Sequence, residues 1–464
     1  MINLRQVESY RENNRIEAKR ALGGLPYSIW ETYSSFANTM GGVILLGVEE
    51  HRDKTFHAVD LPNPQALVEK IWAGLNNPLR VSVNILTRKD VYVARVEGKR
   101  IVVIEVPRAH RADKPVYIEN DIWNGTYRRG GEGDYRCTPE EISAMRRDAM
   151  TRTQDMQLLD DLRLDSLKKE SIAAYRALIH TLRPGHALER CTDHEMLIQL
   201  GAAGTGEDRV LHPSAAGLLM FGYYEEILRV FPHYALHLRI HAQGDGALAR
   251  NLLEFYQAAN AALETAFPRS ATAREAATEA LCNCIVNADY RGVGGILIEK
   301  NDTVLRFSNP GGFRIDPHRA RTGGISDSRN RALSHMFVLI GVGAGVGGGI
   351  PRMLRAWRAG GRPTPYFSEG FEPDRTTLTL PLVRGTEVTV SQGRRVVPAP
   401  YAKQLIAEYL TTVIYARAGQ ISSVLGLSLS RVQRCLAEMK ADRVVIAEGE
   451  GKSTVWRLRE RAGL

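Results

Sequence analysis

A carboxylate and two carboxamides recur at four-residue intervals in one stretch of the chain. On a helix, Glu279, Asn283 and Asn287 would lie along a single face. A carboxylate in such a row can orient a water molecule for attack on a phosphoryl group, and the amide oxygen one turn later can bind Mg²⁺. The alternative is a solvated helix face with ordinary polar side chains. A phosphate site is therefore indicated only if further groups converge on this row.

Two glycine-containing segments downstream could supply those groups. Asn309 follows the predicted strand Val304 to Ser308 and precedes Pro310-Gly311-Gly312, so its side-chain carbonyl could accept a hydrogen bond from an adenine amino group. The run Gly341 to Gly349 leads into a predicted helix, Ile350 to Arg358, where backbone N–H groups can bind phosphates. The residues that we expect to contact a nucleotide are Asn283, Asn309, Gly311, Gly345, Gly347 and Gly348.

The order of these motifs resembles a known superfamily. Glu-x3-Asn, then Asn-Pro-Gly-Gly and a glycine-rich segment before a helix are similar to the ATP-binding proteins that include gyrases, chaperones and histidine kinases (GHKL). Four segments look more narrowly like the divergent ATPase module of predicted bacterial transcriptional regulators often labelled RecG-related: Glu279 to Tyr290, Asn309 to Phe313, Gly323 to Asn330 and Asp374 to Pro381. The resemblance implies ATP and Mg²⁺ as cofactors.

The same resemblance assigns roles to single residues. It makes Glu279 the general base of an ATPase, Asn283 the magnesium ligand and Asn309 the adenine contact, with the glycines as a lid over the phosphates. Two positions depart from the pattern: Asn309 stands where the superfamily has aspartate, and Asn287 stands where relatives of the module often carry histidine. We expect ATP binding, and hydrolysis stays open.

The N-terminal 145 residues carry a second set of motifs. Glu17-Ala-Lys19-Arg20, Ser35 to Gly42, Gly47 to Glu50 and Tyr127 to Gly130 resemble, as a set, the Schlafen AlbA domain over nearly this whole region. That family is associated with DNA binding. The resemblance therefore implies phosphate contacts by the basic residues of these motifs, which are Lys19, Arg20, Arg128 and Arg129.

Acidic residues in the same region allow an alternative activity. Eukaryotic Schlafen nucleases use an acidic triad that matches the Glu-x4-Glu spacing of Glu12 and Glu17, and Glu49 or Glu50 could complete it. Such a cluster around a divalent metal ion could cleave phosphodiesters. Structural ion pairs to Lys19 or Arg128 explain the same acids without catalysis.

The C-terminal region has the pattern of a winged helix. Predicted helices over Ala402 to Thr412, Gln420 to Leu425 and Ser430 to Lys440 precede two short strands around Gly449-Glu450-Gly451. The third helix would carry the side chains that reach base edges or phosphates in a major groove, namely Arg431, Gln433 and Arg434. The alternative is a winged helix that contacts protein.

Composition limits the class of protein. The 464 residues carry a formal charge of +9, which favours polyanionic partners, and DNA more than RNA is expected. The five cysteines form no CxxC pair, and the N-terminus has no apolar signal segment. We therefore expect a cytoplasmic protein with neither export nor membrane insertion.

Pattern shifts along the chain predict a multidomain α/β (α+β) protein. The expected parts are an AlbA-like domain at 1–145, a mixed α/β connecting domain at 146–270, a GHKL-like ATP-binding sandwich at 271–385, a linker at 386–400 and a winged helix-turn-helix domain at 401–464.

Three functions fit these parts. The one that we favour is an ATP-binding, nucleotide-responsive DNA-binding transcriptional regulator. An ATP-gated, metal-dependent nuclease, of use in phage defence, and a scaffold with a degenerate nucleotide pocket are the alternatives. The resemblance to the ATP-binding superfamily also implies a homodimer.

Overall fold

The computed structural model covers most of the chain in two compact units. Unit 1 comprises the described residues within 1–150, 413–418 and 436–464, and unit 2 those within 151–412 and 419–435. The structure describes residues 15–51, 56–130, 133–240, 248–315, 317–324, 326–343, 347–371, 373–382, 402–403, 406–407, 410, 415–425, 427–442, 444–449 and 454–459. The expected linker at 386–400, Glu12 and Gly345 lie outside these residues.

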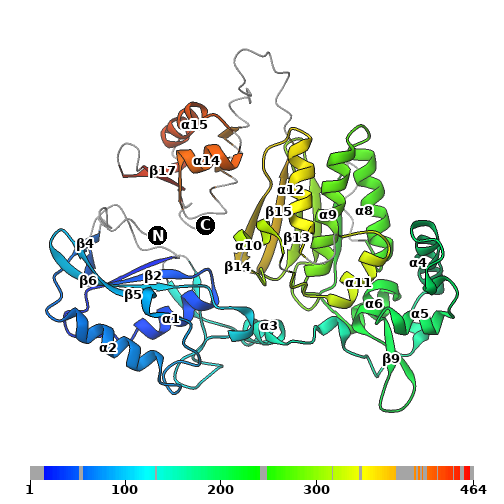
Figure 1. The fold of residues 1–464 in the computed structure, drawn as a ribbon, viewed down its shortest axis with the longest axis horizontal. Helices are drawn as coiled ribbons and strands as arrows, with labels where there is room; N and C mark the ends of the chain where they lie inside the picture. Colours follow the sequence, from blue (N-terminus) through cyan, green and yellow to red (C-terminus); the bar gives the residue numbers. More distant parts are fainter. Residues whose placement is uncertain are drawn as a thin grey trace. The chain divides into compact units, whose positions relative to one another are not determined.

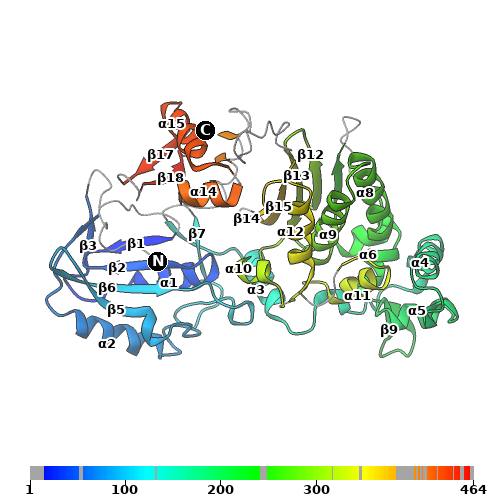
Figure 2. The same ribbon diagram turned by 45° about the horizontal axis from the view of Figure 1, so that its top comes forward.

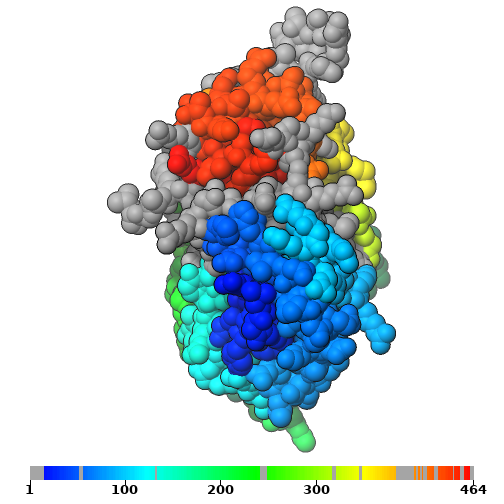
Figure 3. All heavy atoms as spheres, turned by 90° about the vertical axis from the view of Figure 1, so that its left-hand side faces the viewer, coloured from blue at the N-terminus to red at the C-terminus, as the bar shows by residue number. Residues whose placement is uncertain are grey.

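The N-terminal part of unit 1 is built on a mixed sheet of order β1-β2-β6-β5, in which β1 runs parallel to β2 and the other pairs are antiparallel. Figure 3 shows this part, in blue to cyan, as a closely packed body. Its elements are β1 (Ile16–Lys19), α1 (Ile29–Asn38), β2 (Gly42–Leu46), β3 (Val48–Glu50), β4 (Phe56–Ala58), α2 (Pro64–Leu75), β5 (Val91–Val96), β6 (Lys99–Val106), β7 (Tyr127–Gly130), β8 (Gly133–Arg136) and α3 (Pro139–Ala149).

Apolar side chains of the central strands point alternately to the two sides of the sheet, so both of its faces are apolar. Ile44 and Leu46 pack in one core cluster with residues of α1 and α2, whereas Leu45, between them, packs in another with residues of β3 and β4. The strand β2 ends before Gly47, whose φ of +84° and close approach to Leu61 suit glycine alone. The chain therefore turns there from β2 into β3.

The helix α3 begins directly after Thr138, which caps its first turn. Thr138 Oγ1 accepts from the backbone N–H of Glu141, and the Glu141 carboxylate accepts in return from the Thr138 N–H. Pro139 occupies the first turn, where its missing N–H costs nothing.

Unit 2 begins with a helical region and continues into a five-stranded sheet. The helical region contains α4 (Lys169–Leu182), α5 (Asp193–Gln199), the antiparallel pair β9 (Ala203–Thr205) and β10 (Leu211–Pro213), α6 (Ala215–Phe221) and α7 (Tyr224–Val230). The sheet has the order β11-β12-β13-β15-β14 and is antiparallel except for the pair β11 and β12. Its strands are β11 (Leu236–Arg239), β12 (Ile296–Lys300), β13 (Val304–Pro310), β14 (Tyr366–Phe371) and β15 (Asp374–Pro381).

Helices accompany this sheet in a second layer. Figures 1 and 2 both show α8, α9 and α12 lying side by side along it. Their buried residues form one core cluster with those of the strands, and Trp357 Nε1 of α12 donates to the Pro381 carbonyl of β15 at 3.2 Å. The helices are α8 (Leu252–Ala266), α9 (Ala271–Asn287), α10 (Pro317–Thr322), α11 (Arg331–Leu339) and α12 (Gly349–Ala359).

The expected boundary at residue 270 falls inside unit 2. The strand β11 lies in the stretch assigned to a connecting domain, yet it pairs with β12 from Leu236 opposite Ile296 to Arg239 opposite Glu299. The helix α8 shares a core with α9 across the same boundary. The structure therefore builds one sheet and one core from both predicted parts.

The C-terminal elements comprise two helices and a small antiparallel sheet of order β16-β18-β17. They are β16 (Ala416–Arg417), α14 (Ala418–Leu425), α15 (Leu429–Ala441), β17 (Val445–Glu448) and β18 (Val455–Leu458). The expected helix over Ala402 to Thr412 lies largely outside the described residues. None of the described helices combines the length and apolar character needed to cross a bilayer.

Candidate functional site

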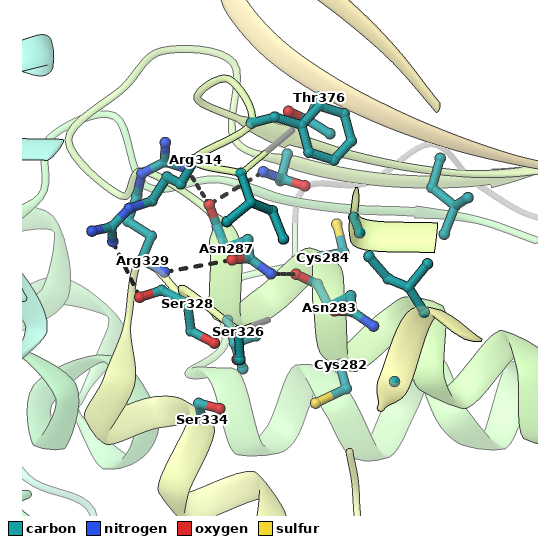
Figure 4. Close-up of a pocket in the computed structure, with 18 of the residues that line it drawn as sticks. Cys282, Asn283, Cys284, Asn287, Arg314, Ser326, Ser328, Arg329, Ser334 and Thr376 are labelled. Atoms are coloured by element: carbon teal, nitrogen blue, oxygen red, sulfur yellow. Dashed lines mark hydrogen bonds between the residues drawn. The ribbon is translucent and has the colours of Figure 1, made fainter. Parts of the chain in front are cut away.

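A cavity in unit 2 brings together residues that are far apart in the sequence. Its lining includes Glu279, Asn283 and Asn287 of α9, Asn309 at the end of β13, and Gly347. Figure 4 shows Asn283 and Asn287 following one another along α9, with Arg314 and Arg329 on the side of Asn287 away from Asn283. The predicted polar row therefore faces a cavity, not solvent.

Glu279 is a buried carboxylate at one end of this row. It is only 3% exposed, and the residues next to it on α9, including Ala280 and Leu281, are buried too. A carboxylate in such surroundings needs a charged partner, and Arg352 of α12 supplies one through an ion pair between its Nη2 and Glu279 Oε2. A Cβ at Gly349 would overlap Glu279 Oε1, so a glycine there permits the contact.

Asn283 presents its amide oxygen without a hydrogen-bond donor. Its Nδ2 donates to the Glu279 carbonyl at 2.9 Å and lies 3.5 Å from Glu279 Oε1. Among the described residues nothing donates to Asn283 Oδ1. An amide oxygen on a cavity wall beside a carboxylate is a suitable ligand for Mg²⁺, which commonly takes one or two protein oxygens together with phosphate oxygens.

Asn309, which lines the cavity at the end of β13, also has a bonded amide nitrogen and an amide oxygen without a donor. It is 5% exposed, and its Nδ2 donates to the carbonyls of Pro310 at 3.1 Å and Asn287 at 3.4 Å. No donor within the described part of the chain reaches its Oδ1. The amide is thus held with its acceptor available, as the sequence interpretation of an adenine contact requires.

Two buried arginines support the wall near Asn309. Arg329 donates to the carbonyls of Asn287 and, at 3.0 Å, Gly312, and Arg314 donates to the Ser328 carbonyl at 3.1 Å. Gly311, with φ of +93°, leaves room for the Arg329 guanidinium that a Cβ would fill. Gly311 therefore shapes the wall from behind, whereas Gly312 lines the cavity.

The described glycines before α12 lie at and near the cavity. Gly347 lines it with φ of +65°, and its carbonyl accepts from the Gly324 N–H at 3.3 Å. Gly348 is the N-cap of α12 and has no side chain to cap the first turn, and Gly349 lines the cavity. The backbone N–H groups at this helix start are therefore free of side-chain caps, as a phosphate site requires.

Cysteines and phenylalanines also line the cavity. Cys282 and Cys284 are buried, and burial raises the pKa of Cys284 to about 12 and that of Cys282 further. Both are therefore uncharged at neutral pH and are poor nucleophiles or metal ligands. Phe313 and Phe367 meet edge to face with their ring centroids 5.3 Å apart and offer an apolar surface to a base.

The residues singled out in the N-terminal region are mostly buried in ion pairs. Glu17 Oε1 lies 2.8 Å from Lys19 Nζ, and Glu17 Oε2 lies 2.8 Å from Nη2 of Arg129, whose side chain is 1% exposed. Arg129 also pairs with Asp134 at 3.0 Å, and Arg128 pairs with Glu141 at 2.9 Å. These contacts hold β1, β7, β8 and α3 together.

Arg20 and Glu49 lie at the surface. Their pair, 3.5 Å long, joins side chains that are 62% and 41% exposed. No group of three or more His, Cys, Asp or Glu residues is placed to hold a metal ion in the described ranges, which exclude Glu12. The structure therefore brings Glu17 to basic partners, and the predicted acidic triad stays a prediction because Glu12 lies outside the described residues.

In the C-terminal elements, α15 carries all three candidate base-reading residues. Gln433 and Arg434 are exposed, Arg431 is half-buried, and Val432 and Leu436 of the same helix are buried. The helix thus presents a polar face that contains Gln433 and Arg434.

The sequence did not lead us to Arg352 as the partner of the Glu279 carboxylate, and it placed Gly349 in the glycine run without predicting its contact with Glu279. The signal was present: a cation follows the glycine run by one helical turn, in Gly349-Ile-Pro-Arg352. Sequence reasoning also missed Arg314 and Arg329, because no local pattern shows that an arginine in a loop will fold back onto backbone carbonyls.

Three family models match parts of the chain. Residues 12–138 match the Schlafen AlbA_2 family, and residues 295–380 match HATPase_c_4, described as "Putative ATP-dependent DNA helicase recG C-terminal". Residues 143–237 match a domain of unknown function, DUF8451. The chain therefore holds an AlbA_2 domain and a RecG-like C-terminal HATPase_c_4 domain in a mixed α/β multidomain protein.

Solved structures with some similarity have low TM-scores. A Corynebacterium diphtheriae protein is 18% identical, with 96% of this chain and 95% of that chain covered and a TM-score of 0.40. The N-terminal domain of a RecG-related protein from Nitrosomonas europaea is 31% identical over 29% of this chain and 90% of its own, with a TM-score of 0.23. The Zalpha domain of Carassius auratus PKZ, solved with Z-DNA, is 26% identical over 13% and 97%, with a TM-score of 0.13. No curated protein matches the chain.

Proposed function

We propose that this protein binds ATP with Mg²⁺ in the cavity of unit 2 and that the bound nucleotide controls how it engages DNA, as in a transcriptional regulator. The observation that carries the proposal is that Asn283 and Asn309 line one cavity and that their amide oxygens accept from no described donor. One suits a metal-bound phosphate and the other an adenine amino group.

Other residues of the cavity could contact the base, the metal ion and the phosphates of the same ATP molecule. The side-chain oxygen of Asn309 and the Phe313 ring would contact the base, and Asn283 would bind Mg²⁺ next to the phosphates. The start of α12 offers backbone N–H groups to phosphate oxygens. Glu279 would act as the base of a GHKL-type ATPase, with Arg352 as its ion-pair partner.

DNA engagement is proposed on separate grounds. The chain has a formal charge of +9 and contains an AlbA_2 domain. The C-terminal order of α14, α15 and the β17–β18 pair supports a winged helix whose exposed Gln433 and Arg434 would contact DNA. The ion pairs of Lys19, Arg128 and Arg129 leave these cations little exposed, whereas the pair of Arg20 with Glu49 is at the surface. We therefore assign N-terminal phosphate contacts to Arg20.

The test is DNA binding measured in the presence of ATP, ADP or no nucleotide. Fragments selected from genomic DNA by the full chain would be labelled, and their affinities measured at fixed salt by fluorescence anisotropy. We expect ATP with Mg²⁺ to change the affinity at least fivefold, and Asn283→Ala to remove that response while preserving binding without nucleotide. Identical affinities under all three conditions would refute nucleotide control.

A further inference from the structure

An exposed cation reaches the buried acid of the cavity from a different element. Glu279 belongs to α9 and is 3% exposed, whereas Arg352 belongs to α12 and its side chain is 39% exposed. Their ion pair holds the partly exposed Arg352 guanidinium against Glu279, which lines the cavity. Arg352 lies one turn beyond Gly349, which lines the cavity where the glycine segment enters α12.

The guanidinium of Arg352 has donors to spare. Its Nη2 serves Glu279, and its Nε lies 3.9 Å from Glu275 Oε1, too far for a hydrogen bond. The Nε is buried and has no hydrogen-bond partner among the described residues. A guanidinium carries five N–H donors in a rigid plane, so one edge can bind a carboxylate while another binds a phosphate.

A nucleotide in this cavity would bring its own negative charge next to the Glu279 carboxylate. The two anions repel each other unless a cation lies between them, and Arg352 is the cation that contacts Glu279 in the described structure. We propose that Arg352 binds the terminal phosphate of a nucleoside triphosphate while Glu279 holds its guanidinium in place, so that Arg352 distinguishes ATP from ADP. This inference rests on the proposed nucleotide site.

The geometry explains why Arg352, and not a neighbouring arginine, has this role. Arg355, three residues further along α12, is exposed and makes no ion pair with Glu279. Arg314 and Arg329 are buried and donate to backbone carbonyls of the wall. Arg352 alone among these four combines solvent exposure with a fixed position at the acid.

The experiment compares ATP and ADP affinities of the full chain by calorimetry. The wild-type protein should bind ATP more tightly than ADP, and Arg352→Met should weaken ATP binding by about 10- to 100-fold while changing ADP binding by less than about threefold. Arg355→Met, which removes the same charge from the same helix, should leave both affinities unchanged.

Removing Arg352 could disturb folding because it leaves Glu279 buried without a cation. The pair of variants Glu279→Gln and Glu279→Gln with Arg352→Met avoids that problem, and the second should lose ATP affinity relative to the first but keep its ADP affinity. Equal loss of ATP and ADP affinity, or none, in both comparisons would overturn the assignment. Wild-type protein that binds neither nucleotide would instead refute the nucleotide site itself.

Discussion

At the scale of single residues, the fixed amide of Asn309 predicts a preference among bases. Its Nδ2 is used by two carbonyls, so only its Oδ1 can face a ligand. Adenine presents an amino group where guanine presents a carbonyl, and the Asn309 oxygen would attract the first and repel the second. We expect wild-type protein to bind ATP at least tenfold more tightly than GTP.

Asn309→Ala should weaken ATP binding by about tenfold, because one hydrogen bond from the base is lost, and should strengthen GTP binding, because the repulsion between two acceptors is removed. Competition of both nucleotides against a fluorescent ATP analogue would measure the ratio. Equal affinity of the wild-type protein for ATP and GTP would show that Asn309 does not contact the base.

Glu17 offers a second prediction at this scale. Glu17→Gln should lower the free energy of unfolding by about 1.5–3 kcal/mol, because Lys19 and the buried Arg129 each lose a charged partner. Glu49→Gln removes only an exposed pair with Arg20 and should cost less than about 1 kcal/mol. Urea denaturation would compare the two variants, and equal losses would contradict the structural role.

The same Glu17 variant tests the nuclease alternative. Labelled tRNA, single-stranded RNA and DNA would be incubated with the full chain and Mg²⁺ or Mn²⁺. Cleavage that disappears with Glu17→Gln in a still folded protein would mean that the ion pairs open to bind metal. Cleavage that persists would have to come from another site.

The sequence showed which residues are charged, but it did not show which of them are buried. The four-residue spacing of Glu279, Asn283 and Asn287 was enough to predict a shared face, because helical geometry is local. The ion pairs of Arg129 could not be predicted from the sequence, because its partners Glu17 and Asp134 lie on other strands. A basic motif therefore looks the same in sequence whether it meets DNA or a buried acid.

At the scale of elements, α9 predicts a pattern of thiol reactivity. Cys282 and Cys284 lie on this helix, are buried, and have raised pKa values, whereas Cys191 is half-buried. Only the thiolate is alkylated efficiently, so at pH 8 iodoacetamide should label Cys191 well before either α9 thiol. Peptide mass spectrometry over time would show the order, and urea-unfolded protein, in which the thiols should be labelled alike, is the control. Early labelling of Cys282 or Cys284 would mean that α9 is not packed as described.

The helix α15 carries the prediction for DNA. Arg434→Ala should weaken binding and reduce the slope of log affinity against log salt by about 1, as expected for one lost phosphate contact. Arg355→Ala removes the same charge from α12 in unit 2 and should leave the slope unchanged. If both variants act equally, binding depends on net charge and not on α15.

Short sequence patterns were enough to predict many helices and strands, but they did not predict which strands pair with one another. The strand expected over Val304 to Ser308 is confirmed within β13, and the capping residues Thr138 and Pro139 are a local signal for α3. The pairing of β11 with β12 joins residues about sixty positions apart, and nothing near Leu236 specifies it. This is why the predicted boundary at 270 divided a single sheet.

At the scale of the whole molecule, we propose that unit 2 recognises ATP and that the AlbA_2 domain and the C-terminal elements contact nucleic acid. ATP could alter DNA binding only if it favoured one of two arrangements of the protein. The described glycines Gly347 to Gly349, where the cavity meets α12, are the place at which a phosphate would act on the structure.

The most direct test of the central claim is calorimetric titration of the full chain with ATP, with and without Mg²⁺. We predict one saturable site per chain, at least tenfold weaker in EDTA and at least tenfold weaker for Asn283→Ala with Mg²⁺ present. Absence of saturable binding, or binding that neither EDTA nor Asn283→Ala changes, would contradict a magnesium-nucleotide site at the α9 row.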